Sequence, residues 1–213
     1  MLEWEQGRDL YKIAIPTNEG FLSNGQGNDL NSLGHRCKEI KDVLGDDLQF
    51  SKYFLVLGDN RCLHMHKPIE ETWPYLLSKQ INHQYYNLAV QNGGLDCIKF
   101  NLFNWRYKYS QPKMIFISCE WANSFLGVDY EDESVLKASE LADTNGYWKG
   151  RSRMFSKLLA HIDIPIYQIV GPDDVPIDLT DTIKTIDVDV VDDANIAQIV
   201  SEGFLEAQRA ISV

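Results

Sequence analysis

The stretch FLVLGDNRCLHMH, residues 54–66, joins an apolar run to a polar loop. Its first four residues are all apolar, which is typical of a strand buried on both faces of a parallel sheet. A Gly-Asp pair ends the run, and an asparagine, a cysteine and two histidines follow. Ligands of open α/β sheets bind outside the carboxyl ends of the strands. The stretch therefore predicts both a central strand and the edge of a functional site.

Short β-rich runs alternate with helical segments along the rest of the chain, a pattern typical of a parallel sheet with helices on both faces. The predicted strands are YFLVL (53–57), YYNLAV (85–90), KMIFIS (113–118), PIYQIV (165–170) and TIDVDVV (185–191), the last as an exposed edge strand. The predicted helices are ETWPYLLSKQI with Thr72 as its N-cap, LDCIKFNLFNWRYKY, DESVLKASELAD, WKGRSRMFSKLLAHI and DDANIAQIVSEGFLEAQRAI. We expect a three-layer, doubly wound (flavodoxin-like) α/β fold with about five strands.

The chain length is that of one domain, and no shift in composition divides it. Residues 1–51 contain a short apolar run and then a stretch rich in Gly, Asn and Ser. Turn chemistry dominates there, so we expect an N-terminal β/loop extension packed on the main domain. Residues 52–213 form the predicted α/β domain.

The formal net charge of -11 argues against nucleic acid as a partner, because affinity for phosphate backbones comes from Lys and Arg. The first residues, MLEWEQGRDLYK, carry charges where a signal peptide needs an apolar core, and no apolar run is long enough to span a bilayer. We therefore expect a cytoplasmic protein without membrane contact, or a component of an assembly built in the cytoplasm. The four cysteines lie far apart without a CxxC pair, which predicts reduced thiols.

Four loops follow the predicted strands and should meet at one edge of the sheet. They are GDNRCLHMHK, QNGG, CEWANSF and DDAN. In this order they resemble the loops of the SGNH or GDSL-type hydrolases. The resemblance extends over about residues 30–211, and the segments NSLGHRCKEI and EETWPYLLSKQI are similar to a branch common in bacteria and phages.

The resemblance implies specific site residues. In the family, a serine nucleophile, an oxyanion-binding glycine, an asparagine and a closing Asp-x-x-His follow successive strands. The matching positions here are Asn60, Gly93 or Gly94, Asn123, and Asp192 or Asp193. A turn that needs glycine explains the Gly pair equally well.

Two departures from the family pattern fall on its catalytic groups. Asn60 stands in the serine position, and an amide has no hydroxyl that a base could activate. The last histidine of the chain is His161, so the closing motif lacks its imidazole. The resemblance therefore implies a protein that has lost serine-esterase activity and acts as a binding module or as part of an assembly such as a virion.

An active hydrolase with a substituted apparatus is the first alternative. Cys62, His64 and His66, together with an aspartate, contain a thiol and the imidazoles that could activate it. The competing interpretation makes Cys62 a small, partly buried residue and the histidines exposed loop residues. A purely structural protein with a closed cleft is the second alternative.

Neither a cofactor nor a metal is predicted. His64 and His66 form an H-x-H pair whose side chains would share one face of an extended segment. The third ligand of such a weak metal site would come from Asp59, Asp192 or Asp193.

A glycan or an acyl ester is the predicted ligand. Asp59, Gly94, Trp121 and Asp193 would line its cleft, and aromatic side chains suit stacking on sugar faces. The tryptophans near the loops are Trp73, Trp105, Trp121 and Trp148, although Trp at helical spacing is more often part of a core. Protein partners in a larger assembly are the other predicted contacts.

Overall fold

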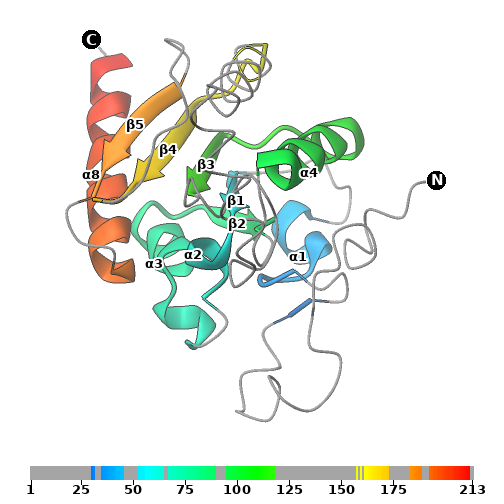
Figure 1. Cartoon of the computed structure of the whole chain (residues 1–213), viewed down its shortest axis with the longest axis horizontal. Helices are drawn as coiled ribbons and strands as arrows, with labels where there is room; N and C mark the ends of the chain where they lie inside the picture. The colour runs from blue at the N-terminus through cyan, green and yellow to red at the C-terminus, as the bar shows by residue number, and fades with distance from the viewer. Residues whose placement is uncertain are drawn as a thin grey trace, which may run out of the picture.

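A computed structural model gives the fold of the chain (Figure 1). The structure describes residues 30–31, 35–45, 52–64, 67–89, 95–118, 157, 159, 161–172, 183–188 and 192–211. Most of the predicted N-terminal extension, the predicted helix DESVLKASELAD and most of WKGRSRMFSKLLAHI lie outside these ranges.

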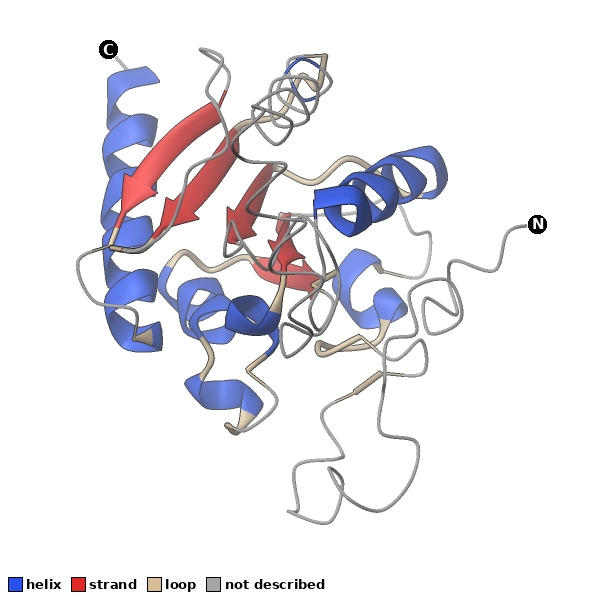
Figure 2. Cartoon of the chain, viewed as in Figure 1, coloured by secondary structure: helices blue, strands red, loops and turns tan. Residues whose placement is uncertain are grey.

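A five-stranded, all-parallel sheet forms the centre of the molecule (Figures 1 and 2). Its strands are β1 (Tyr53–Gly58), β2 (Gln84–Asn87), β3 (Met114–Ser118), β4 (Ile166–Val170) and β5 (Ile183–Asp187). They lie in the order β2-β1-β3-β4-β5, and every neighbouring pair is parallel. This order and the helices that flank the sheet confirm the predicted doubly wound α/β fold.

The two edge strands differ from their predicted bounds. β5 begins two residues before the predicted run and ends at Asp187, because the ladder with β4 runs from Ile166 paired with Ile183 to Val170 paired with Asp187. Lys184 and Asp187 are exposed, as expected at an edge. β2 is shorter than predicted and ends at Asn87, although the Leu88 amide still donates to the carbonyl of Val56 at 2.8 Å.

Helices cover both faces of the sheet (Figures 1 and 2). On one face, α3 (Trp73–Gln80) packs against α8 (Asp193–Ile211). On the other face, α4 (Leu95–Lys108) packs on β1 and α1 (Ile40–Leu44) packs on β2. Two short elements connect β1 to α3: the α2 turn (Asn60–Leu63) and the 3-10 turn η4 (Ile69–Glu71). The predicted helices over α3, α4 and α8 are confirmed.

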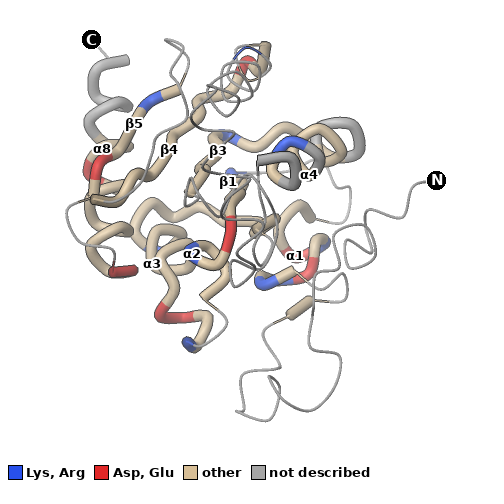
Figure 3. Tube along the Cα trace, in the orientation of Figure 1, with Lys and Arg blue, Asp and Glu red and all other residues tan. Residues whose placement is uncertain are grey.

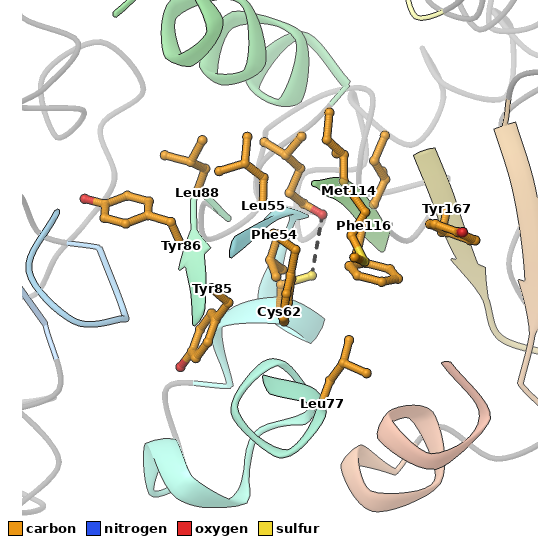
Figure 4. Close-up of a cluster of buried hydrophobic side chains, with 14 of the residues drawn as sticks. Phe54, Leu55, Cys62, Leu77, Tyr85, Tyr86, Leu88, Met114, Phe116 and Tyr167 are labelled. Carbon is orange, nitrogen blue, oxygen red and sulfur yellow. Dashed lines mark hydrogen bonds between the residues drawn. The ribbon is translucent and has the colours of Figure 1, made fainter. Parts of the chain in front are cut away.

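Aromatic side chains of the central strands form much of the core beneath α3 (Figure 4). The Phe116 ring lies edge-on to Phe54, with centroids 5.3 Å apart, and edge-on to Trp73 at 6.2 Å. Fully burying a large apolar side chain stabilises a fold by about 2 to 3 kcal/mol. This packing fixes the strand ends from which the polar loops emerge.

Candidate functional site at the carboxyl edge of the sheet

The carboxyl ends of β1 and β3 mark the point where the strand order reverses. From β1 the chain continues to β2 on one side and then to β3 on the other side of β1. Gly58 at the end of β1 is in register with Ser118 at the end of β3. Ligands of this fold type bind at such a reversal point. The loop that follows β1 therefore occupies the expected position of a site.

Gly58 allows the two strand ends to approach each other. Its φ of +152° lies in a region that side chains with a Cβ rarely adopt. A Cβ at this position would lie 1.9 Å from the carbonyl oxygen of Ser118 and 2.8 Å from the Cys62 sulfur. Only glycine fits here without displacing the neighbouring strand.

The α2 turn presents Asn60 to solvent. Asp59 precedes it and caps the turn, since one of its carboxylate oxygens accepts from the Arg61 amide at 3.1 Å. Asn60 is exposed and is the first residue of α2. The His64 amide donates to the Asn60 carbonyl at 2.8 Å, so Asn60 and His64 stand one helical turn apart. Residues four apart share one face of a helical turn.

Cys62 is a core residue. Only 1% of it is exposed, and its thiol lies 3.4 Å from the Ser118 carbonyl oxygen and 3.6 Å from that of Leu57 (Figure 4). A sulfur enclosed in this way has no open path to a substrate, which speaks against an attacking thiolate. Cys37 is also buried, and burial raises the pKa of its thiol to about 12. Neither of these two cysteines forms a disulfide.

Asp193 has three polar neighbours in the loop after β1 and in α3. His64 Nε2 lies 3.0 Å from one carboxylate oxygen, and the Trp73 amide donates to the same oxygen at 2.7 Å. The Lys67 ammonium contacts the other oxygen. Asp193 is only 4% exposed, and His64 is 12% exposed. The carboxylate thus joins the start of α8 to the start of α3, whose first amides lack helical partners.

The carboxylate of Asp193 stays ionised across the neutral range. Burial raises its pKa, but hydrogen bonds from His64, Lys67 and the Trp73 amide outweigh burial and lower the pKa to about 2. An ionised carboxylate only accepts hydrogen bonds, which suits the Trp73 amide and the Lys67 ammonium beside it. Figure 3 shows acidic residues at the end of β1 and at the start of α8.

Arg36 fixes the backbone that carries His64 and Lys67. Its guanidinium is buried and donates to the carbonyl oxygens of Leu63, His64 and Lys67. His64 adopts a left-handed conformation, with φ 44° and ψ 51°, at the end of α2. Such a conformation is uncommon outside glycine and persists where surrounding contacts determine it.

Four polar residues beside the site were not among the predicted site residues: Arg36, Lys67, Asn87 and Ser118. Asn87 ends β2. Its side-chain nitrogen donates to the backbone carbonyl of Cys62 at 2.8 Å, and its side-chain oxygen accepts from the backbone amide of Ala89 at 3.0 Å. Ser118 Oγ is buried, and no residue of the described ranges hydrogen-bonds it. A polar residue within an apolar strand, as in YYNLAV and KMIFIS, was the available signal for both.

Some predicted site residues make other contacts in the structure, and others are not described. Asp192 is exposed and caps α8, with a carboxylate oxygen 2.9 Å from the Asn195 amide. Trp73 and Trp105 are fully buried core residues. Outside the described residues are His66, Gly93, Gly94, Trp121, Asn123 and Trp148. Among the described residues, no three His, Cys, Asp or Glu side chains gather as ligands of a metal ion.

Comparisons with known proteins add one distant likeness in structure. No family model and no curated protein matches the chain. A solved structure of a carbohydrate esterase, whose active site is described as displaying divergent catalytic and non-catalytic binding functions, has a TM-score of 0.42 and 10% sequence identity. The match covers 75% of this chain and 65% of that chain. No helix in the described ranges is long and apolar enough to cross a membrane.

Proposed function

We propose that the chain is an SGNH-like binding module that has lost serine-esterase activity and holds a glycan or an acyl-bearing polymer at the carboxyl edge of its sheet. The observation that carries the proposal is the exposed Asn60 at the first position of α2, beside the strand reversal. An amide donates and accepts hydrogen bonds but has no ionisable hydroxyl, so it suits binding a hydroxyl or carbonyl rather than attacking one.

The neighbouring groups support binding rather than nucleophilic attack. Cys62, the thiol nearest in sequence to Asn60, is enclosed in the core. Asp193 contacts His64, Lys67 and the Trp73 amide, which favours a fixed arrangement of the loop. A binding site with fixed polar groups loses less conformational entropy when a ligand binds. Such a module would act in the cytoplasm or in an assembly formed there, such as a virion.

An active hydrolase with a substituted apparatus is the second candidate. The contact between His64 and Asp193 favours it, because a carboxylate that orients an imidazole is the usual support of a general base in acyl transfer. In this alternative, the base would act with Cys62 or His66. The burial of Cys62 weighs against it, since the sulfur would have to become accessible before each turnover.

A glycan array and a panel of chromogenic esters, applied to the whole chain, separate these functions. We expect glycan binding without ester turnover. Asn60→Ala should weaken binding about tenfold, the effect of losing one or two good hydrogen bonds. Asp192→Asn is the matched control, because Asp192 is exposed and caps α8.

Two results would contradict the proposal. Ester turnover that disappears in His64→Gln would establish the second candidate. If the chain binds no glycan or acylated polymer and turns over no ester, then the alternative of a purely structural protein gains support.

A further inference from the structure

A pocket of about 390 Å³ lies along α3, away from the candidate functional site. It opens beside Gln84 and Tyr85, the first residues of β2, whereas the candidate site lies at the carboxyl ends of the strands. Residues of α3 and η4 complete its wall. Its volume falls within the range of small-molecule sites. We call it the α3 pocket.

Two lysines give the α3 pocket its positive charge. Lys38 Nζ lies 3.3 Å from the side-chain oxygen of Gln84, and Lys79 Nζ lies 5.1 Å from the centre of the Tyr75 ring. Both lysines line the pocket, against one acidic residue, Glu70. In a chain with a net charge of -11, such a pocket is a local site of attraction for an anion.

The rest of the lining suits a polyhydroxylated ring. Glu70 and Gln84 provide oxygens that accept hydrogen bonds from hydroxyl groups. Tyr85 packs its ring on Phe54, with centroids 5.9 Å apart, and Figure 4 shows its side chain directed toward α3. Phenol rings offer both an apolar face and a polar tip to a sugar. A simple inorganic anion would leave these acceptors without a function.

We propose that the α3 pocket binds a small acidic sugar, with its carboxylate on Lys38 or Lys79 and its hydroxyls on Glu70 and Gln84. This site goes beyond the proposed function, because none of its groups belongs to the loop after β1. The ligand is either a free monosaccharide or one residue of an acidic polysaccharide.

The test is a titration of the ¹⁵N-labelled full chain, followed by the amide shifts of residues 78–85. The probes are D-glucuronate, a short oligogalacturonate, D-glucose and inorganic phosphate. We expect glucuronate to bind with a Kd of about 1 mM, as the size of the ligand suggests. The double variant Lys38→Gln/Lys79→Gln should bind at least about tenfold more weakly. Tighter binding of the oligogalacturonate would support the proposal and identify the polymer as the source.

Lys184→Gln is the matched control. Lys184 lies over the Tyr167 ring at 5.8 Å on the opposite edge strand, so its loss should leave the titration unchanged. Equal binding of glucose, equal binding of phosphate, or no shift with any probe would each overturn the proposal. The amide shifts of residues 78–85 report on the α3 pocket, and the effect of Asn60→Ala on the glycan array reports on the proposed function, so failure of one is distinguishable from failure of the other.

Discussion

Two clusters of polar side chains attach the segment that contains Asn31, His35 and Arg36 to the sheet. The two clusters differ in the charged groups that they contain. The carboxyl-edge cluster comprises Arg36, His64, Lys67 and Asp193. The β2 cluster comprises Asn31, His35 and Tyr86, in which the Tyr86 hydroxyl lies 3.1 Å from the Asn31 amide nitrogen and 3.0 Å from His35 Nδ1. The neighbouring residues His35 and Arg36 thus belong to different clusters.

The β2 cluster attaches this segment without a carboxylate, an ammonium or a guanidinium group. Burial raises the pKa of the Tyr86 hydroxyl well above its ordinary value, so this hydroxyl remains neutral. Burying a charged group costs more free energy than burying a neutral one. Attaching this segment to the sheet does not by itself require a buried charge. We therefore infer that the charged groups at the carboxyl edge hold the loop after β1 in one conformation.

Gly58→Ala should have the largest effect on stability, because it disturbs the backbone at the carboxyl ends of β1 and β3. The methyl group would overlap the Ser118 carbonyl oxygen, and the φ of +152° would become strained. We expect a loss of about 4 kcal/mol in the free energy of unfolding. Chemical denaturation followed by circular dichroism measures it.

Gly203→Ala is the control for this prediction. A Cβ at Gly203 in α8 meets no atom within 4 Å, so alanine should stabilise the helix by about 0.5 to 1 kcal/mol. If both variants retain wild-type stability, the close approach of β1 and β3 at Gly58 does not occur.

Arg36 variants test whether a charged group fixes the loop. Arg36→Met leaves one buried and two partly buried carbonyl oxygens without the guanidinium and should cost about 3 kcal/mol. Arg36→Lys keeps the charge but loses the planar fork, and should cost about 2 kcal/mol. The resonances of the His64 ring should shift in both variants, because the left-handed backbone of His64 loses its support. Unchanged His64 resonances would show that Arg36 does not position this residue.

The sheet could be predicted from sequence because its signal is local. Buried parallel strands are short apolar runs, and β1 and β3 agree with their predicted bounds to within one residue. The start of β5 could not be predicted, since its bounds follow from pairing with β4. An edge strand with one exposed face has a weaker hydrophobic pattern, so its partner decides its length.

Only part of the candidate site could be predicted from sequence. Strand order predicts that Asp59, Asn60 and the first residues of α8 meet at one edge, because they follow strands of a parallel sheet. The contact between His64 and Asp193 depends on the left-handed turn at His64, which no local pattern encodes. The role of Arg36 was even harder to predict, because a buried arginine that binds backbone carbonyls has no motif in the sequence.

Asp193→Asn should remove the carboxylate of the carboxyl-edge cluster while keeping the shape of the side chain. The pKa of Asp193 is about 2 in the folded chain, below its ordinary value of 3.8, so the ionised form stabilises the fold above about pH 4. This contribution is lost as the pH falls below about 4 and through about 2. We expect the variant to be about 2 kcal/mol less stable at pH 7 and to reach the stability of the wild type only below about pH 2. Urea denaturation across this range measures both.

Asp192→Asn is the matched control for the acid dependence. Asp192 is exposed, and asparagine is an equally good N-cap for α8, so stability should change by less than about 0.5 kcal/mol. A difference between Asp193→Asn and the wild type that does not vary with pH would show that Asp193 acts through its shape and not its charge.

Tyr86→Phe should have the smallest effect and is the counterpart in the β2 cluster. It removes the hydroxyl shared by Asn31 and His35 but keeps the ring, which packs on Trp105 with centroids 4.4 Å apart. We expect a loss of about 1 kcal/mol, the net worth of a neutral hydrogen bond. Since no carboxylate takes part in these hydrogen bonds, and histidine side chains ordinarily titrate well above pH 4, the loss should be the same at pH 4 and at pH 2. A loss that changes between these pH values would remove the distinction between a carboxyl edge that depends on a carboxylate and a β2 cluster that does not.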